Sequence, residues 1–169
     1  MIPAKDAEAF LRETLDLGSG EVRQQAILAL ASGAGDGCRG VLKAILADAS
    51  EPLNTRALCA LSLAHLGETD ISPAVMALAL QADSPALLRS LLHSLRRLGA
   101  ALELDAVTAL IEKHGKGEAA VLSAQLLGHV GEPALQMARD LATTGSSDPV
   151  KVAAIEAMAM IGTPAAMEQ

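Results

Sequence analysis

Glycine recurs at a nearly constant interval along this chain of 169 residues. Gly99 follows Gly67 by 32 residues, Gly131 follows Gly99 by 32, and Gly162 follows Gly131 by 31. Each of these glycines closes a segment rich in Ala and Leu, and an earlier copy closes at Gly33, 34 residues before Gly67. A fixed period of this length is typical of a repeat array, so we expect the chain to stack similar units.

The residues at the ends of each unit predict two helices per repeat. Glycine is favoured just past a helix end, where a left-handed backbone costs least without a side chain. Proline is favoured in the first helical turn, where its missing N–H is not needed, and all seven prolines fit that position. Ser84 and Asp148 precede two of them as a capping and an acidic residue. The expected helices are 3–16, 20–32, 37–48, 52–66, 71–82, 85–98, 101–114, 117–130, 133–143 and 148–161.

Composition favours helices over strands. Hydrophobic residues make up 51% of the chain, yet Phe10 is its one aromatic residue and Trp and Tyr are absent. The apolar content is mostly Ala and Leu, which are strong helix formers, whereas β-sheets draw on aromatic and β-branched residues. We therefore predict an all-α protein.

One segment resembles a known repeat family. "DPVKVAAIEAMAMIG" (148–162) resembles the second half of a HEAT-like repeat, the short variety also seen in phycobilin lyases. That pattern is an acidic residue and Pro, a Val followed by Arg or Lys, alternating Ala and Leu or Ile, and a closing Gly. "EVRQQAILALASG" and "NTRALCALSLAHLG" look like weaker copies, and "GEAAVLSAQLLGHVG" lacks the basic residue. The resemblance covers nearly the whole chain. It implies a helical scaffold whose second helices line a concave binding side, since HEAT-like families are mostly scaffolds and adaptors, with a few enzymes.

A two-helix unit of this size cannot bury its own apolar face, so neighbouring units must stack. The prediction is a right-handed α-solenoid, an α–α superhelix of about five antiparallel helix pairs, forming a single domain over residues 1–169. The expected pairs are 3–33, 37–67, 71–99, 101–131 and 133–162, followed by a short tail at 163–169.

The segment "RSLLHSLRRLG" (89–99) is the most basic part of an acidic chain. On a helical projection Arg89, His93, Arg96 and Arg97 share one face. Five leucines share the other: Leu88, Leu91, Leu92, Leu95 and Leu98. No acidic residue lies within 85–98, so the three arginines are expected to be unopposed. This face is either simply solvated or a binding surface.

The repeat register favours a binding surface. His65, Arg97 and His129 each stand two residues before a closing glycine, so they are expected to lie in one column on neighbouring helices, about 10 Å apart. Met160 occupies the same position in the last repeat, where the column turns apolar. Such a surface fits an acidic or mixed acidic and apolar segment of a partner protein.

Several functional classes lack support in the sequence. A net charge of −7 and a lack of aromatic platforms argue against nucleic-acid binding. The chain shows no apolar run of about 18 residues and no secretory signal, so we expect no membrane insertion and a cytoplasmic location. It carries no G-x-S-x-G, P-loop, H-E-x-x-H or CxxC motif, and the four histidines are too scattered for a metal site. No cofactor is expected.

These features predict a non-enzymatic adaptor that binds a protein partner through Arg89, His93, Arg96, Arg97, His65, His129 and Met160. Two alternatives stay open. One is a lyase-like or other ligand-handling protein. The other is a structural subunit or homo-oligomer sealed through its C-terminal repeat, because the last predicted helix lacks a polar cap.

Overall fold

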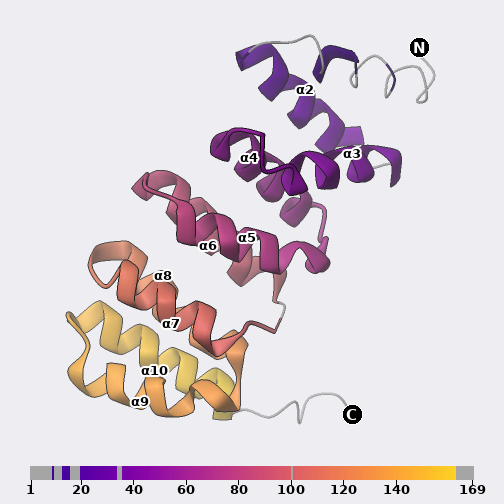
Figure 1. Cartoon of the computed structure of the whole chain (residues 1–169). Helices are drawn as coiled ribbons and strands as arrows, with labels where there is room; N and C mark the ends of the chain where they lie inside the picture. Colours follow the sequence, from indigo (N-terminus) through magenta and orange to yellow (C-terminus); the bar gives the residue numbers. More distant parts are fainter. Residues whose placement is uncertain (1–8, 10–12, 16–19, 34–35, 100, 163–169) are drawn as a thin grey trace, which may run out of the picture.

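A computed structural model describes residue 9 and residues 13–15, 20–33, 36–99 and 101–162. Within these residues the chain forms helices and no strand, which confirms the predicted all-α class. Figure 1 shows the helices stacked in chain order from the N-terminal to the C-terminal end. They are α2 (Gly20–Gly33), α3 (Asp36–Ala47), α4 (Leu53–His65), α5 (Ser72–Gln81), α6 (Pro85–Leu98), α7 (Leu104–Lys113), α8 (Gly117–Val130), α9 (Leu135–Thr144) and α10 (Asp148–Gly162).

The helices pack in two rows. In the even row, α2, α4, α6, α8 and α10 each contact the next member. In the odd row, α3, α5, α7 and α9 each pack against the even helix that follows in the chain. Contacts therefore join neighbours in sequence, as stacked two-helix units require. Most of the predicted helix 3–16 lies outside the described residues.

At α6, glycine and proline mark the helix ends as the sequence predicts. Gly99 is the C-cap of α6 and has a left-handed φ of 60°, a conformation that is costly for a residue with a Cβ. Pro85 occupies the first turn of the same helix. The expected side-chain cap is wrong in detail, because Ser84 is the N-cap residue but its side chain makes no capping hydrogen bond.

Two predicted helices begin later than expected. The helix expected from residue 101 begins at Leu104, because the backbone N–H of Leu102 donates a 3.2 Å hydrogen bond to the carbonyl of His129 and ties the connection to α8. The helix expected from residue 133 is preceded by a 3-10 turn, Glu132–Ala134, and a similar turn, Thr69–Ile71, precedes α5. Short 3-10 turns are common at helix ends.

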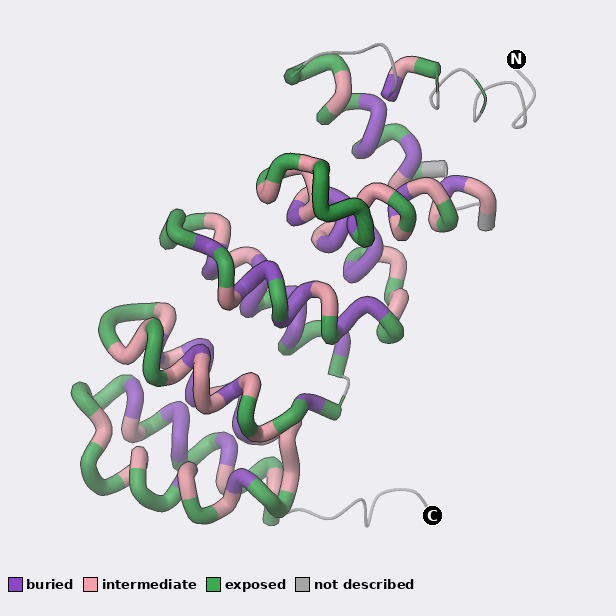
Figure 2. Tube along the Cα trace, in the orientation of Figure 1, coloured by how far each residue is buried: buried purple, intermediate pink, exposed green. Residues whose placement is uncertain are grey.

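The core consists mainly of leucine and alanine between the rows. Figure 2 shows the buried residues on the sides where helices meet and the exposed residues along the outer turns. Full burial of one leucine contributes roughly 1.5–3 kcal/mol, so the apolar face of α6 is a large part of the stabilisation around it. Five of its six leucines are buried, as the sequence predicts for that face, and Leu87 is half-buried. The buried five are Leu88, Leu91, Leu92, Leu95 and Leu98.

Candidate functional site

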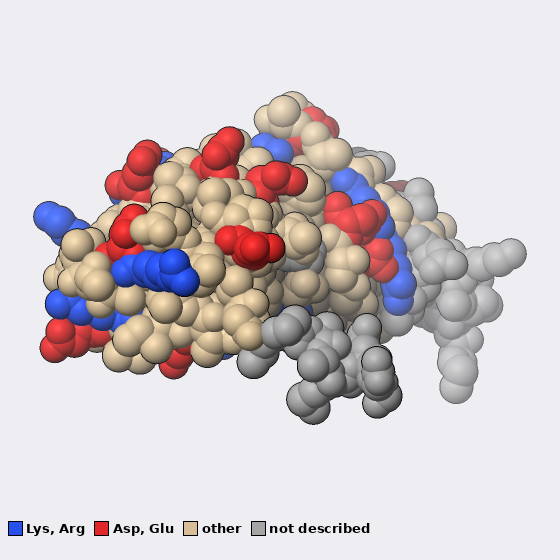
Figure 3. Space-filling view, turned by 90° about the horizontal axis from the view of Figure 1, so that it is seen from below, with Lys and Arg blue, Asp and Glu red and all other residues tan. Residues whose placement is uncertain are grey.

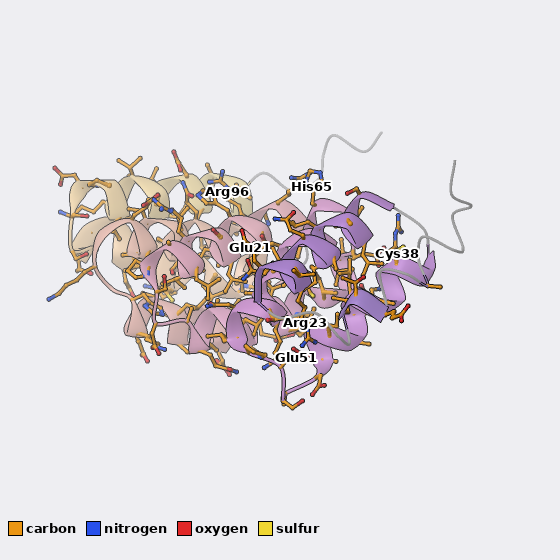
Figure 4. All side chains as sticks on the ribbon, turned by 90° about the horizontal axis from the view of Figure 1, so that it is seen from above. Glu21, Arg23, Cys38, Glu51, His65 and Arg96 are labelled. Atoms are coloured by element: carbon orange, nitrogen blue, oxygen red, sulfur yellow. The ribbon has the colours of Figure 1, made fainter. Side chains whose placement is uncertain are left out.

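Polar side chains connect successive even-row helices on one side of the molecule. Figure 4 shows His65 and Arg96 along one edge, with Arg23 and Glu51 along the opposite edge. We call the connected set on the His65 edge the polar ladder. It consists of His65 with Arg97, Arg89 with Glu118, and Arg96 with Gln125 and Glu156.

The longest part of the ladder crosses three helices. Arg96 on α6 donates from Nη1 to Oε1 of Gln125 on α8, at 2.7 Å. Gln125 in turn donates from Nε2 to Oε2 of Glu156 on α10, at 3.0 Å. The Gln125 amide thus bridges the Arg96 cation and the Glu156 anion. Its oxygen accepts and its nitrogen donates, which fixes the orientation of the amide.

The arginines are not unopposed, and that prediction is wrong. Nη1 of Arg89 lies 3.1 Å from Oε2 of Glu118, which begins the next even-row helix. The acidic partner was missed because it comes from a neighbouring repeat, 29 residues further along the chain. Both side chains remain open to solvent, with 50% of Arg89 and 60% of Glu118 exposed.

The predicted column is formed where α4 meets α6. Nη1 of Arg97 lies 3.2 Å from Nδ1 of His65. A guanidinium only donates, so this hydrogen bond requires an unprotonated Nδ1 on His65. His93, one turn before Arg97, is exposed on the same helix, and its side chain makes no hydrogen bond to another described residue. The ladder side therefore presents arginine and imidazole together.

Further along the column, His129 and Met160 line a shallow groove of about 310 Å³ between α6, α8 and α10. Burial lowers the pKa of His129, and the positive charge of Arg96 lowers it further. His129 therefore favours its neutral form. The complete lining is Arg96, Gln125, His129, Glu156, Ala157 and Met160.

Met160 is held by a glycine beneath it. A Cβ built on Gly128 of α8 would lie 2.8 Å from Sδ and 3.2 Å from Cβ of Met160. The absence of a side chain at Gly128 therefore lets Met160 seat against α8. Nevertheless 48% of Met160 stays exposed, so it offers an adaptable apolar contact beside the polar ladder.

A larger cavity of about 590 Å³ lies at the opposite ends of these helices, where the α5–α6 and α7–α8 turns meet. The sequence analysis did not predict it, because it forms from turn residues without a motif. Its basic residues, Arg89, Lys113 and Lys116, are matched by the acidic residues Asp83, Glu112 and Glu118. Lys113 already donates to the carbonyl of Leu80. This balance gives the cavity no preference for an ion of either sign.

Ion pairs on the other side of the stack have a structural role. Lys43 of α3 contacts Glu68 at 2.6 Å and Asp70 at 2.9 Å, and Arg39 also contacts Glu68. The hydrogen bond from Lys43 is the main cause of a lowered pKa at Glu68. Arg23 pairs with Glu51 in the same way. These pairs join one repeat to the next.

The described residues contain no cluster of three His, Cys, Asp or Glu side chains that could hold a metal ion. Cys38 and Cys59 are free and buried, and burial raises the pKa of Cys59 to about 12, so its reactive thiolate is disfavoured. Within the described part of the chain, no helix combines the length and apolar character needed to span a membrane. Compared with models of known protein families and with curated proteins, the chain matches none.

Proposed function

We propose that the chain is a cytoplasmic, non-enzymatic adaptor built as a right-handed solenoid of about five HEAT-like helix pairs. It binds an acidic or mixed acidic and apolar segment of a partner protein along the polar ladder. The observation that carries this proposal is the exposed row of arginines on α6 beside the half-exposed Met160.

The ladder contacts leave the arginines able to bind a partner. An ion pair between exposed side chains contributes at most about 1 kcal/mol. Little free energy is therefore lost when Arg89 exchanges Glu118 for a carboxylate of the partner. A guanidinium has five N–H donors, and the hydrogen bonds described for Arg96 and Arg97 each use one nitrogen. The remaining donors support bidentate binding of a carboxylate.

The groove suits an apolar side chain next to that carboxylate. Ala157 is fully buried at its base, and Met160 forms an exposed wall. Because His129 favours the neutral form, it can donate or accept one hydrogen bond without adding a charge. Interfaces draw most of their binding free energy from a few such arginine and apolar anchors.

The test is affinity capture with the full chain, followed by quantitative mass spectrometry. Arg96→Glu combined with Arg97→Glu is expected to lose the specific partner. The matched control reverses two charges elsewhere, with Lys113→Glu at the end of α7 and Lys116→Glu just before α8. Retention of every captured protein by the Arg96/Arg97 variant, or equal losses from both variants, would contradict the proposal.

Small-molecule handling is a second candidate, favoured by the cavity at the α5–α6 and α7–α8 turns. Its volume of about 590 Å³ lies within the range of ligand sites, roughly 300–1,000 Å³. Native mass spectrometry of the full chain distinguishes this function, because a ligand-handling protein is expected to carry a defined additional mass that Leu88→Trp removes.

A further inference from the structure

At the C-terminal end of the even row, α10 exposes a face whose equivalent on α8 is covered by the next helix. We call Val152, Ile155 and Ala159 of α10 the end face. Each residue lies 31 positions after its equivalent in α8, the set Val121, Ala124 and Gly128.

In α8 these positions receive the next helix. Ala124 is fully buried in a cluster with Val150 and Ala153 of α10. Gly128 lies beneath Met160, also from α10. The α8 set is therefore part of a helix-packing surface that also includes Ala120. On α10 the repeat keeps the three end-face positions apolar and places Lys151 at the position equivalent to Ala120.

On α10 the end face is open, with 54% of Val152 and 55% of Ile155 exposed. Figure 3 views this end from below and shows a broad area of uncharged residues between acidic and basic side chains. The exposed large apolar side chains among the described residues lie only on α2 and α10, the two ends of the described even row. A repeat array needs polar outer faces at its ends, and this apolar face fails that requirement.

The two ends of the row differ in how much apolar surface they expose. Both set their apolar residues beside polar ones, with Glu21 and Gln24 on α2 and Lys151 and Glu156 on α10. Among the described residues α10 exposes three large apolar side chains and α2 exposes two. The C-terminal end is therefore the one that gains most from being covered.

The charges around the end face are self-complementary. Arg139 of α9 and Glu156 of α10 are both exposed. Asp140 of α9 faces α7, because it lines the groove between these two helices. The neighbouring Arg139 is rotated about 100° around the axis of α9, so it lies away from α7. Because α9 and α10 run antiparallel through a short turn, Arg139 is level with Ala153, within one turn of Glu156.

A twofold axis parallel to these helices lays α10 of one copy across α9 of the other. It brings each Arg139 near the partner subunit's Glu156, and Val152 and Ile155 leave solvent. At 1.5 Å per residue α10 is about 22 Å long. Side by side, α9 and α10 are about 20 Å wide, so together they present roughly 440 Å² in each copy. The total of about 900 Å² is below the roughly 1,200–2,000 Å² of stable specific interfaces, so the contact belongs to the small, weakly associating class.

We propose that the end face is the interface of a symmetric dimer of this chain. A twofold contact closes on itself, whereas a contact between α10 of one copy and α2 of the next would grow into open filaments. The dimer shares Glu156 with the polar ladder and leaves the α6 arginines uncovered. Its tests measure the oligomeric state, so failure of the dimer and failure of partner binding are distinguishable.

Sedimentation velocity of the full chain, in a concentration series up to about 100 µM, tests the dimer. The natural sequence is expected to sediment as a dimer and Ile155→Asp as a monomer, with unchanged helicity because Ile155 is exposed. Leu28→Asp is the matched control, since it places the same charge on a residue 44% exposed at the other end, and it is expected to stay dimeric.

Three outcomes overturn the proposal: a natural sequence that stays monomeric throughout the series, dissociation by Leu28→Asp but not by Ile155→Asp, or open-ended growth.

A charge exchange tests the symmetric geometry itself. Arg139→Glu is expected to weaken the dimer at least tenfold, and adding Glu156→Arg is expected to restore much of that loss. Equal dissociation of the single and double variants would contradict the twofold arrangement.

Discussion

Gly128 and Met160 form a packed pair whose energetics depend on a competition between helix propensity and space. Gly128 lies inside α8, where replacing glycine by alanine normally stabilises a helix by about 1 kcal/mol. Here the new Cβ would lie 2.8 Å from Sδ, 3.1 Å from Cε and 3.2 Å from Cβ of Met160. Those separations are closer than ordinary contact, so Met160 must move.

Overpacking of this kind costs about 1–3 kcal/mol. Part of the strain is relieved because Sδ and Cε belong to a flexible side chain, but Cβ of Met160 is fixed by the backbone of α10. The net effect of Gly128→Ala on the free energy of unfolding is therefore expected to lie between no change and a decrease of about 2 kcal/mol. When Met160→Ala removes Sδ and Cε, the same substitution is expected to stabilise the protein by about 0.5–1 kcal/mol.

Urea denaturation of the four proteins in this double-mutant cycle measures the difference. The expected coupling free energy is about 1–2 kcal/mol, with the same dependence on urea in every variant. An equal effect of Gly128→Ala in the two backgrounds would refute the reasoning, because it would mean that Met160 does not seat on Gly128.

Three further measurements probe the buried groups. Ser123→Ala is expected to raise the free energy of unfolding by about 1 kcal/mol in urea denaturation, because the Ser123 hydroxyl is buried without a hydrogen-bond partner, and any loss of stability would contradict this. With Cys38→Ser in place, Cys59 is expected to react with a thiol reagent at about pH 8 only as fast as the protein opens, since burial raises its pKa to about 12; a rate unaffected by stabilising conditions would argue otherwise. The pKa of His129 is held below its ordinary value of 6.5 in the folded chain, so the unfolded chain binds the proton more readily and stability falls as the pH drops through that range. His129→Gln should flatten this fall in urea titrations at several pH values, and an unchanged slope would show that His129 does not contribute.

Local signals in the sequence account for most of the fold. The predicted helix 85–98 corresponds to Pro85–Leu98, because proline, a one-sided leucine pattern and a closing glycine all agree. The start of α7 was misplaced because it depends on a hydrogen bond between Leu102 and His129, which are distant in sequence. A pattern confined to one segment carries no information on such a contact.

The candidate site was predicted only in part. The contact between His65 and Arg97 follows from the repeat period, because the two residues occupy equivalent positions 32 residues apart. Glu118 was missed as the partner of Arg89 because their separation of 29 residues crosses that register. Such a pair depends on how far one helix slides and rotates against the next, which periodicity does not specify.

The packing of each even-row helix against only its nearest neighbours also bears on how the chain folds. Its long cross-helix hydrogen bonds join residues 27 to 33 positions apart, so even the tertiary contacts close short loops. Short loops cost little entropy to close, and a chain of this kind can start folding at any pair and extend in both directions. We therefore expect fast folding, and opening that begins at the ends of the stack while α4 to α8 stay protected from hydrogen exchange longest.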